Sequence, residues 1–169
     1  VNFHDAFTSH DGSSVSIVME YCAGGSLQDL SAVVGPLDED ILSSVAYDAL
    51  RGLTTIHRLG LLHRDIKPSN MLLDANGCVK LADFGLVREV APTVTTLEPT
   101  LLAQTFVGTA VYMSPERLRG NLYSYPSDVW SLGLSLLTLA LGRFPLNVPR
   151  NNLYWHLMKA LCPQTSEGE

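Results

Sequence analysis

Residues 63–70 read His-Arg-Asp-Ile-Lys-Pro-Ser-Asn, and this stretch decides how the rest of the chain is interpreted. It places a carboxylate, an ammonium group and an amide in one short segment, at Asp65, Lys67 and Asn70. A carboxylate can accept the proton of a hydroxyl group, and carboxylate and amide oxygens are ligands for hard cations. Each of these residue types alone is also typical of a turn or a helix cap. The interpretation therefore depends on the motifs that follow.

Three further motifs come after this stretch in a fixed order. Asp83 begins an Asp-Phe-Gly triplet, residues 114–116 read Ser-Pro-Glu, and residues 128–133 read Asp-Val-Trp-Ser-Leu-Gly. Together with residues 63–70 they resemble the catalytic loop, the metal-binding motif and the later motifs of protein kinases. The resemblance implies transfer of the γ-phosphate of ATP to a protein hydroxyl, with Mg²⁺ as the cofactor that offsets the negative charge.

The resemblance implies a role for each matching residue of the catalytic centre. Asp65 would accept or orient the proton of the substrate hydroxyl, and Lys67 would contact the transferring phosphate. Asn70 and Asp83 would hold magnesium ions beside the phosphates of ATP. Thr109 would contact both the catalytic aspartate and the lysine, as in the serine/threonine class. Phosphorylation of serine and threonine is therefore expected, and tyrosine as an acceptor stays open.

A second segment of the sequence resembles the hinge that joins the two lobes of a kinase. Met19, Glu20 and Cys22 would line the adenine pocket there, with main-chain groups meeting the edge of the base. The plain end of a strand is the alternative interpretation of this segment.

Three residues are expected to support the site rather than to react. His63 has apolar neighbours and is expected to pack in the core instead of acting as a general base. Asp128 would accept backbone hydrogen bonds from the catalytic loop, and a charge favoured by a helix dipole is the alternative. Glu116 is expected to be buried without the arginine that usually pairs with it, which would make the chain marginally stable.

Longer stretches resemble one branch of the family, the MAP kinase kinases: residues 3–27, 106–118 and 123–145. This likeness implies a protein substrate such as a MAP kinase, together with an upstream activating kinase. Members of the branch are switched by two phosphorylated hydroxyl residues that lie four positions apart.

The regulatory pattern departs from that branch at one position. Thr105 fits the second switch residue, but the first falls on Leu101, so Thr100 is the substitute. Arg64 would bind the phosphate, because its planar guanidinium suits an anion with several acceptor oxygens. Both threonines fall within residues 86–107, which are expected to form a long functional loop.

Composition excludes several classes of protein. The chain has 169 residues with 11 Lys and Arg against 17 Asp and Glu, a net charge of −6, which argues against nucleic-acid binding. Apolar residues make up 46%, so a core is expected. Three widely spaced cysteines show no disulfide or zinc pattern, and a reducing, cytoplasmic location is expected. The most apolar stretch, residues 129–141, is too short to cross a bilayer and predicts a buried helix.

The pattern of apolar residues predicts an α+β, kinase-like fold that is mostly helical. Val15–Tyr21 and Val1–Phe7 predict a hairpin, and apolar residues spaced by three and four predict a long helix over 42–56. Ser127 is expected to cap a second helix that runs to Gly142.

The expected domain organisation follows from the resemblance. Residues 1–21 would be the end of the small-lobe sheet and the start of the hinge, and 22–169 a C-terminal lobe that stops before its last helices. No glycine-rich phosphate loop or ATP-binding lysine strand is visible, so the chain is expected to be a piece of a longer kinase and inactive alone. The alternative is a pseudokinase or truncated product that acts as a protein-binding module.

Overall fold

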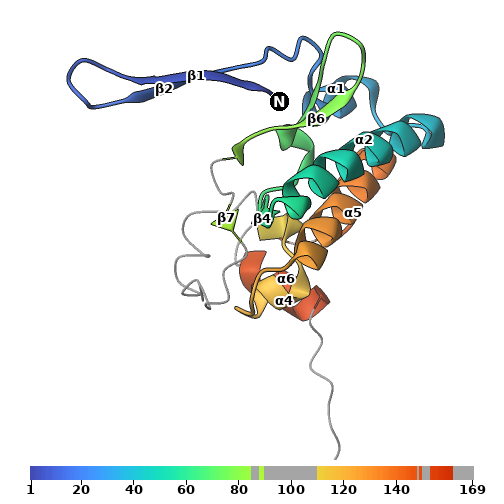
Figure 1. Cartoon of the computed structure of the whole chain (residues 1–169). Helices are drawn as coiled ribbons and strands as arrows, with labels where there is room; N and C mark the ends of the chain where they lie inside the picture. Colours follow the sequence, from blue (N-terminus) through green and yellow to red (C-terminus); the bar gives the residue numbers. More distant parts are fainter. Residues whose placement is uncertain (85–87, 90–109, 148, 150–152, 162–169) are drawn as a thin grey trace, which may run out of the picture.

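The computed structural model describes residues 1–84, 88–89, 110–147, 149 and 153–161. Its centre is a pair of long helices, α2 (Glu39–Arg58) and α5 (Tyr125–Leu141), which lie side by side in the body of the molecule (Figure 1). Leucine side chains from both helices, among them Leu53 and Leu139, belong to one buried cluster. The predicted combination of helices with small sheets is confirmed.

Helix α2 follows the sequence prediction and extends beyond it at both ends. Its buried residues, Val45, Ala49 and Leu53, recur every four positions and form the face that packs on the core. Acidic Glu39 and Asp40 occupy its first turn, where the helix dipole favours negative charge.

Helix α5 begins earlier than the sequence predicted. Tyr125 is its first residue and Ser124 precedes it, so the expectation that Ser127 caps the helix is wrong. The reason is Pro126, which fits the first turn because the amide hydrogen it lacks would have no partner there. At the other end Gly142 has a φ of +62° and ends the helix as expected.

Only one face of α5 is covered by the described part of the chain. Leu132, Ser135 and Leu139 are buried, whereas Val129 and Leu137 are 49% and 46% exposed. Among the residues that the structure describes, the predicted buried helix is therefore buried on one face only. Periodicity could not show this, because the exposed face is also apolar, with Trp130 beside Val129 and Leu137.

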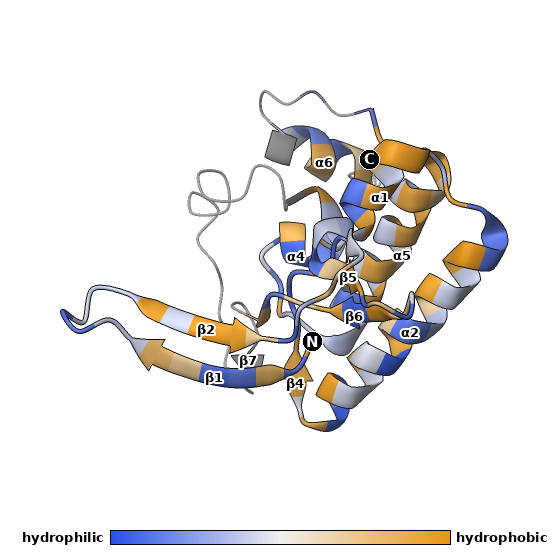
Figure 2. Cartoon of the chain, turned by 90° about the horizontal axis from the view of Figure 1, so that it is seen from above, coloured by the Kyte–Doolittle hydropathy of each residue, from blue (hydrophilic) through white to orange (hydrophobic). Residues whose placement is uncertain are grey.

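The predicted hairpin is present at the start of the chain. Strands β1 (Phe3–Thr8) and β2 (Val15–Met19) pair antiparallel and extend away from the helical body (Figure 1). Every residue of both strands is exposed, including several apolar ones that are visible in Figure 2.

Short elements connect the hairpin to the two long helices and surround the segment of residues 63–70. Strands β3, β5 and β6 form one small antiparallel sheet, and β4 pairs with β7.

The predicted loop over 86–107 lies almost wholly outside the described residues. No helix among the described residues is long and apolar enough to span a membrane. The remaining bounds are β3 (Gly25–Ser26), α1 (Leu27–Val34), β4 (Leu61–Leu62), η1 (Pro68–Asn70), β5 (Met71–Leu73), β6 (Val79–Leu81), β7 (Arg88–Glu89), η3 (Ala110–Tyr112), α4 (Pro115–Leu118) and α6 (Leu153–Leu161).

Candidate active site

Three of the predicted site residues meet in the loop between β4 and β5. Lys67 Nζ lies 2.9 Å from Asp65 Oδ2, and Asn70 Nδ2 donates to the same oxygen over 2.8 Å. Asn70 Nδ2 also donates to the main-chain oxygen of Asp65 over 2.9 Å. Asp65 is 5% exposed, and its Oδ1 has no hydrogen-bond partner in the described part of the chain. One carboxylate oxygen is thus fixed, and the other is left to accept a hydrogen bond.

The backbone of this loop is held from α5 through Asp128. The amide groups of His63 and Arg64 each donate to its carboxylate over 2.9 Å, which are the hydrogen bonds that the sequence led us to expect. Arg64 has a φ of +70°, a left-handed conformation that is unfavourable for a residue with a side chain. The buried carboxylate therefore stabilises an unfavourable turn immediately before Asp65.

Two further partners of Asp128 were not predicted. His57 Nε2 lies 2.9 Å from Asp128 Oδ2, and the Tyr123 hydroxyl donates to Oδ1 over 2.8 Å. His57 lies in the last turn of α2 with a side chain that is 17% exposed, and nothing in the local sequence indicates this partner. Nothing in the sequence around Tyr123 distinguishes it from an ordinary loop tyrosine.

His63 lies entirely inside the molecule, with its ring centroid 5.2 Å from that of Phe84. Burial is the main cause that lowers the pKa of this histidine, so the neutral ring is favoured. This environment is that of a packed core residue.

Asp83 leaves strand β6 beside the catalytic-loop residues. The amide of Ala82 donates to the main-chain oxygen of Asn70 over 2.9 Å, and Asp83 follows with a φ of +63° and an exposed side chain. In the described residues no group of three or more His, Cys, Asp or Glu side chains is arranged to hold a metal. A magnesium ion commonly takes only one or two protein carboxylates together with substrate phosphates, so this finding is compatible with the predicted ligands.

The predicted hinge residues differ in their surroundings. Met19 ends β2 and is 49% exposed, whereas Cys22 is buried. The Glu20 carboxylate forms a close ion pair with Lys80 and accepts the amide hydrogen of Asn2 over 3.0 Å. The hydrogen bond from Lys80 is the largest cause that lowers the pKa of Glu20. Nothing in the sequence predicts this ion pair, which joins the residue that follows β2 to strand β6.

Glu116 departs from its expected environment. It is only partly buried, and its Oε1 accepts a hydrogen bond of 2.7 Å from the Ser127 hydroxyl. Burial would raise the pKa of Glu116, but the nearby hydroxyl groups of Ser114 and Ser127 outweigh this effect and lower it. The expectation of a buried carboxylate without a partner is therefore wrong. The reason is that Ser127 lies in the first turn of α5 instead of capping it.

The three threonines that were predicted to act in regulation or catalysis, Thr100, Thr105 and Thr109, lie outside the described residues. Arg64 is described, and its guanidinium carbon lies 5.4 Å from the centroid of the Tyr123 ring.

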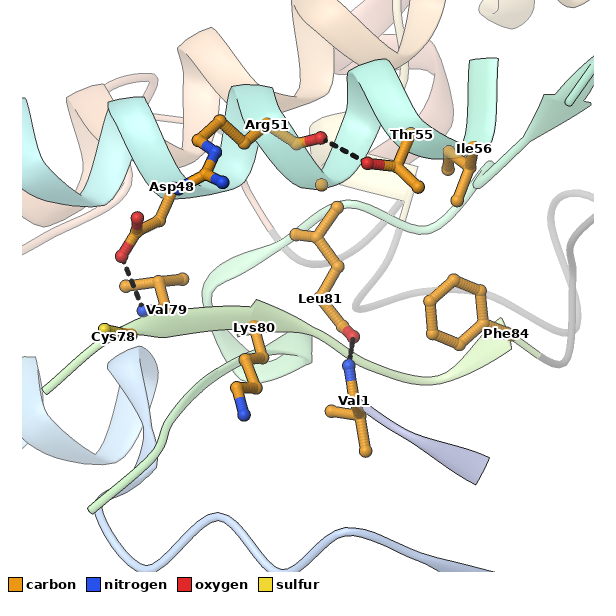
Figure 3. A pocket seen from close by; sticks show the side chains of 11 residues that line it. Val1, Asp48, Arg51, Thr55, Ile56, Cys78, Val79, Lys80, Leu81 and Phe84 are labelled. Carbon is orange, nitrogen blue, oxygen red and sulfur yellow. Dashed lines mark hydrogen bonds between the residues drawn. The ribbon is translucent and has the colours of Figure 1, made fainter. Parts of the chain in front are cut away.

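A cavity of about 420 Å³ lies between α2 and β6, away from Asp65. Figure 3 shows the amide of Val79 donating to Asp48 across its wall, with Lys80 and Phe84 at its rim. None of the predicted site residues that the structure describes lines this cavity.

Comparison with known proteins places this geometry in context. The family model described as "Protein kinase domain" matches residues 1–166. "Mitogen-activated protein kinase kinase 1" of Arabidopsis thaliana is 47% identical over 147 residues, which is 86% of this chain and 40% of that protein. "Mitogen-activated protein kinase kinase 3" of the same plant is 44% identical over 146 residues, 86% of this chain and 27% of the relative. "MAP kinase kinase MKK1/SSP32" of Saccharomyces cerevisiae is 45% identical over 149 residues, which is 86% of this chain and 28% of that protein. The chain thus spans less than half the length of these curated relatives.

Proposed function

This chain belongs to the protein kinase domain family, and on that premise we propose that the full-length protein transfers the γ-phosphate of ATP to a hydroxyl group of a protein. The observation that carries the proposal is the arrangement of Asp65, Lys67 and Asn70. A buried carboxylate with one oxygen fixed by two donors and the other without a partner suits a group that receives the hydrogen of a substrate hydroxyl.

Within this proposal, Asp65 orients the attacking hydroxyl and accepts its proton, and Lys67 offsets charge on the transferring phosphoryl group. Lys67 is 2.9 Å from Asp65, so the same ammonium group also keeps this carboxylate in place. Thr109 is assigned a contact with both residues. Positioning and charge stabilisation supply most of the rate enhancement in phosphoryl transfer.

Asn70 and Asp83 fit the role of magnesium ligands. The Asn70 amide nitrogen donates both to the main chain and to the side chain of Asp65, which leaves Asn70 Oδ1 as the oxygen for a metal. Asp83 adds an exposed carboxylate from the adjoining strand end. When bound, the ion offsets negative charge on the phosphates of ATP.

The proposed division of the chain follows from the hinge. Residues 1–21 form the end of the small-lobe sheet and the start of the hinge, and 22–169 belong to the C-terminal lobe. In this division Met19, Glu20 and Cys22 line the adenine site. Main-chain groups of this segment meet the edge of the adenine, and Met19 lies at the back of the pocket. The Glu20 side chain faces Lys80, which is consistent with only its main chain meeting the base.

His63, Glu116 and Asp128 are proposed to be structural. Asp128 anchors the catalytic loop through the amides of two consecutive residues, and His63 fills the core beneath Phe84. Glu116 joins α4 to α5 through Ser127.

The substrate and activator are proposed from the relatives, whose names describe MAP kinase kinases. The substrate is then a MAP kinase, with serine, threonine or tyrosine acceptors, and an upstream kinase phosphorylates this protein. We assign Thr105 as the main regulatory site, Thr100 as the second, and Arg64 as the group that binds the phosphate.

The direct test is phosphate transfer by the full-length protein and its Asp65→Asn variant. The variant keeps the size of the side chain but removes the negative charge, so transfer to a MAP kinase substrate should fall by at least about a thousandfold. Asp40→Asn is the matched control because Asp40 lies exposed in the first turn of α2, and its activity should equal that of the wild type. An Asp65→Asn variant with most of its activity would remove Asp65 from the assigned role.

A further inference from the structure

Tyr123 lies in the connection between α4 and α5 and touches the site through its hydroxyl group. That hydroxyl donates to Asp128 Oδ1 over 2.8 Å. Burial is the main cause that raises the pKa of Tyr123, and the negative charge of Asp128 adds to it. The phenol therefore stays protonated at physiological pH and acts as a donor.

The hydrogen bonds of Asp128 divide between its two oxygens. Oδ1 accepts from the Arg64 amide and from Tyr123, while Oδ2 accepts from the His63 amide and lies against His57. The Tyr123 hydroxyl thus shares an oxygen with the amide of the residue in the left-handed conformation. Because Arg64 directly precedes Asp65, a change in the orientation of the Asp128 carboxylate would shift the reacting carboxylate as well.

The ring of Tyr123 makes a second connection. The guanidinium carbon of Arg117 lies 4.2 Å from the ring centroid, and that of Arg64 lies 5.4 Å away. Guanidinium groups near an aromatic ring are attracted by its π electrons, and the attraction strengthens when water is excluded. Arg117 is a buried residue of α4, only 7% exposed. One side chain therefore joins α4, the catalytic loop and Asp128.

We propose that Tyr123 is a positioning residue for Asp65. Its hydroxyl orients the Asp128 carboxylate, which in turn holds the turn at His63 and Arg64. Its ring fixes the side chain of Arg64 in the catalytic loop and that of Arg117 in α4. The inference rests on the proposed kinase function, because Asp65 must be the group that meets the substrate hydroxyl. Tyr123 itself does not touch the reacting atoms.

The test compares Tyr123→Phe with the wild type in the full-length protein. The variant keeps the ring and removes only the hydroxyl. We expect kcat to fall about tenfold, which corresponds to roughly 1.4 kcal/mol, while the KM values for ATP and protein substrate change by less than about twofold. Hydrogen exchange at the amides of His63 and Arg64 should become faster. Tyr123→Leu, which also removes the ring, should lower kcat further.

Tyr47→Phe is the matched control. Tyr47 also lies beneath an arginine, with the Arg51 guanidinium carbon 5.6 Å from its ring, but it is 63% exposed on α2. Its kcat and loop exchange should equal those of the wild type.

Two results would overturn the proposal for Tyr123. The first is an unchanged kcat with unchanged exchange in Tyr123→Phe. The second is a lower melting temperature with normal kcat per folded molecule, which would indicate a purely structural role. If the wild type itself transfers no phosphate, the proposed kinase function fails. Hydrogen exchange at the amides of His63 and Arg64 then tests the contact of Tyr123 with Asp128 by itself. Faster exchange in Tyr123→Phe supports this positioning contact, and unchanged exchange contradicts it.

Discussion

The catalytic loop of residues 63–70 and the hairpin β1–β2 are both built without long helices, yet they are held in opposite ways. The loop is buried, and its backbone is fixed by Asp128, a residue more than 60 positions away in sequence. The hairpin is exposed on both faces, and its strands are held by their pairing with each other. The loop therefore takes its shape from distant parts of the chain, whereas the hairpin takes its shape from local pairing.

The strongest test of this contrast removes the carboxylate that anchors the loop. Asp128→Ala deletes the acceptor for two amides and a hydroxyl inside the molecule, so the free energy of unfolding should fall by roughly 3–5 kcal/mol. Phosphate transfer should be lost, and hydrogen exchange at the amides of His63 and Arg64 should accelerate. Urea denaturation and exchange measurements check these outcomes.

The matching aspartate on the hairpin is Asp5. Its side chain is exposed, and within the described part of the chain it accepts only the amide hydrogen of the next residue, over 2.8 Å. Asp5→Ala should change the free energy of unfolding by less than about 0.5 kcal/mol. Equal losses for Asp5→Ala and Asp128→Ala would show that the two regions are not held differently.

A second test compares apolar side chains in the two regions. Leu53 on α2 is 2% exposed, so Leu53→Ala should cost about 2–5 kcal/mol through lost burial and an internal cavity. Ile17 on β2 is 58% exposed, and Ile17→Ala should cost less than about 1 kcal/mol. The midpoints of urea unfolding measure both values. A large loss for Ile17→Ala would mean that another part of the protein covers the hairpin.

The third test addresses the point where the hairpin segment joins the body. A Cβ atom added to Gly24 would lie 2.6 Å from the Cβ of Leu73 on strand β5, which is closer than real atoms approach. Gly24→Ala should therefore destabilise the fold by about 1–3 kcal/mol.

Gly133 on α5 provides the control for the third test. A Cβ atom there would have no neighbour within 4 Å, and alanine favours the helix. Gly133→Ala should raise the free energy of unfolding by about 0.5–1 kcal/mol. A stabilising effect of Gly24→Ala would mean that β3 and β5 separate more easily than the structure indicates.

The same contrast explains what could be predicted from sequence. The hairpin and helix α2 follow local patterns of alternating or helical periodicity, and both were predicted close to their observed bounds. The residues of the catalytic loop could be named from their motif, and the expected hydrogen bonds from the loop to Asp128 are present. The chemical roles of those residues are still predictions.

Other features could not be predicted because they depend on packing between distant segments. The sequence contains two serines near the start of α5, and Pro126 between them fits the first turn of a helix that Ser124 precedes. The contacts of Tyr123 and His57 with Asp128 arise when α2, α5 and the loop come together. The exposed face of α5 carries Val129, Trp130 and Leu137, whereas several serines and Asp128 lie on its buried face, so hydropathy alone could not identify the face that packs on the core.

The smallest expected effect concerns the turn of the hairpin. Hydrogen bonds from Ser9 and then Ser13 lower the pKa of Asp11 from 3.8 to about 2. Because the pKa is lower in the folded turn, the contribution of these bonds is complete above pH 4 and is lost as pH falls toward 2. The chemical shift of the Asp11 carboxyl carbon should titrate with a midpoint near 2. In the double variant Ser9→Ala with Ser13→Ala the midpoint should move toward 3.8, whereas Ser16→Ala, on strand β2, should leave it unchanged. A wild-type midpoint near 3.8 would show that the turn does not persist in solution, and that local pairing alone does not fix the hairpin.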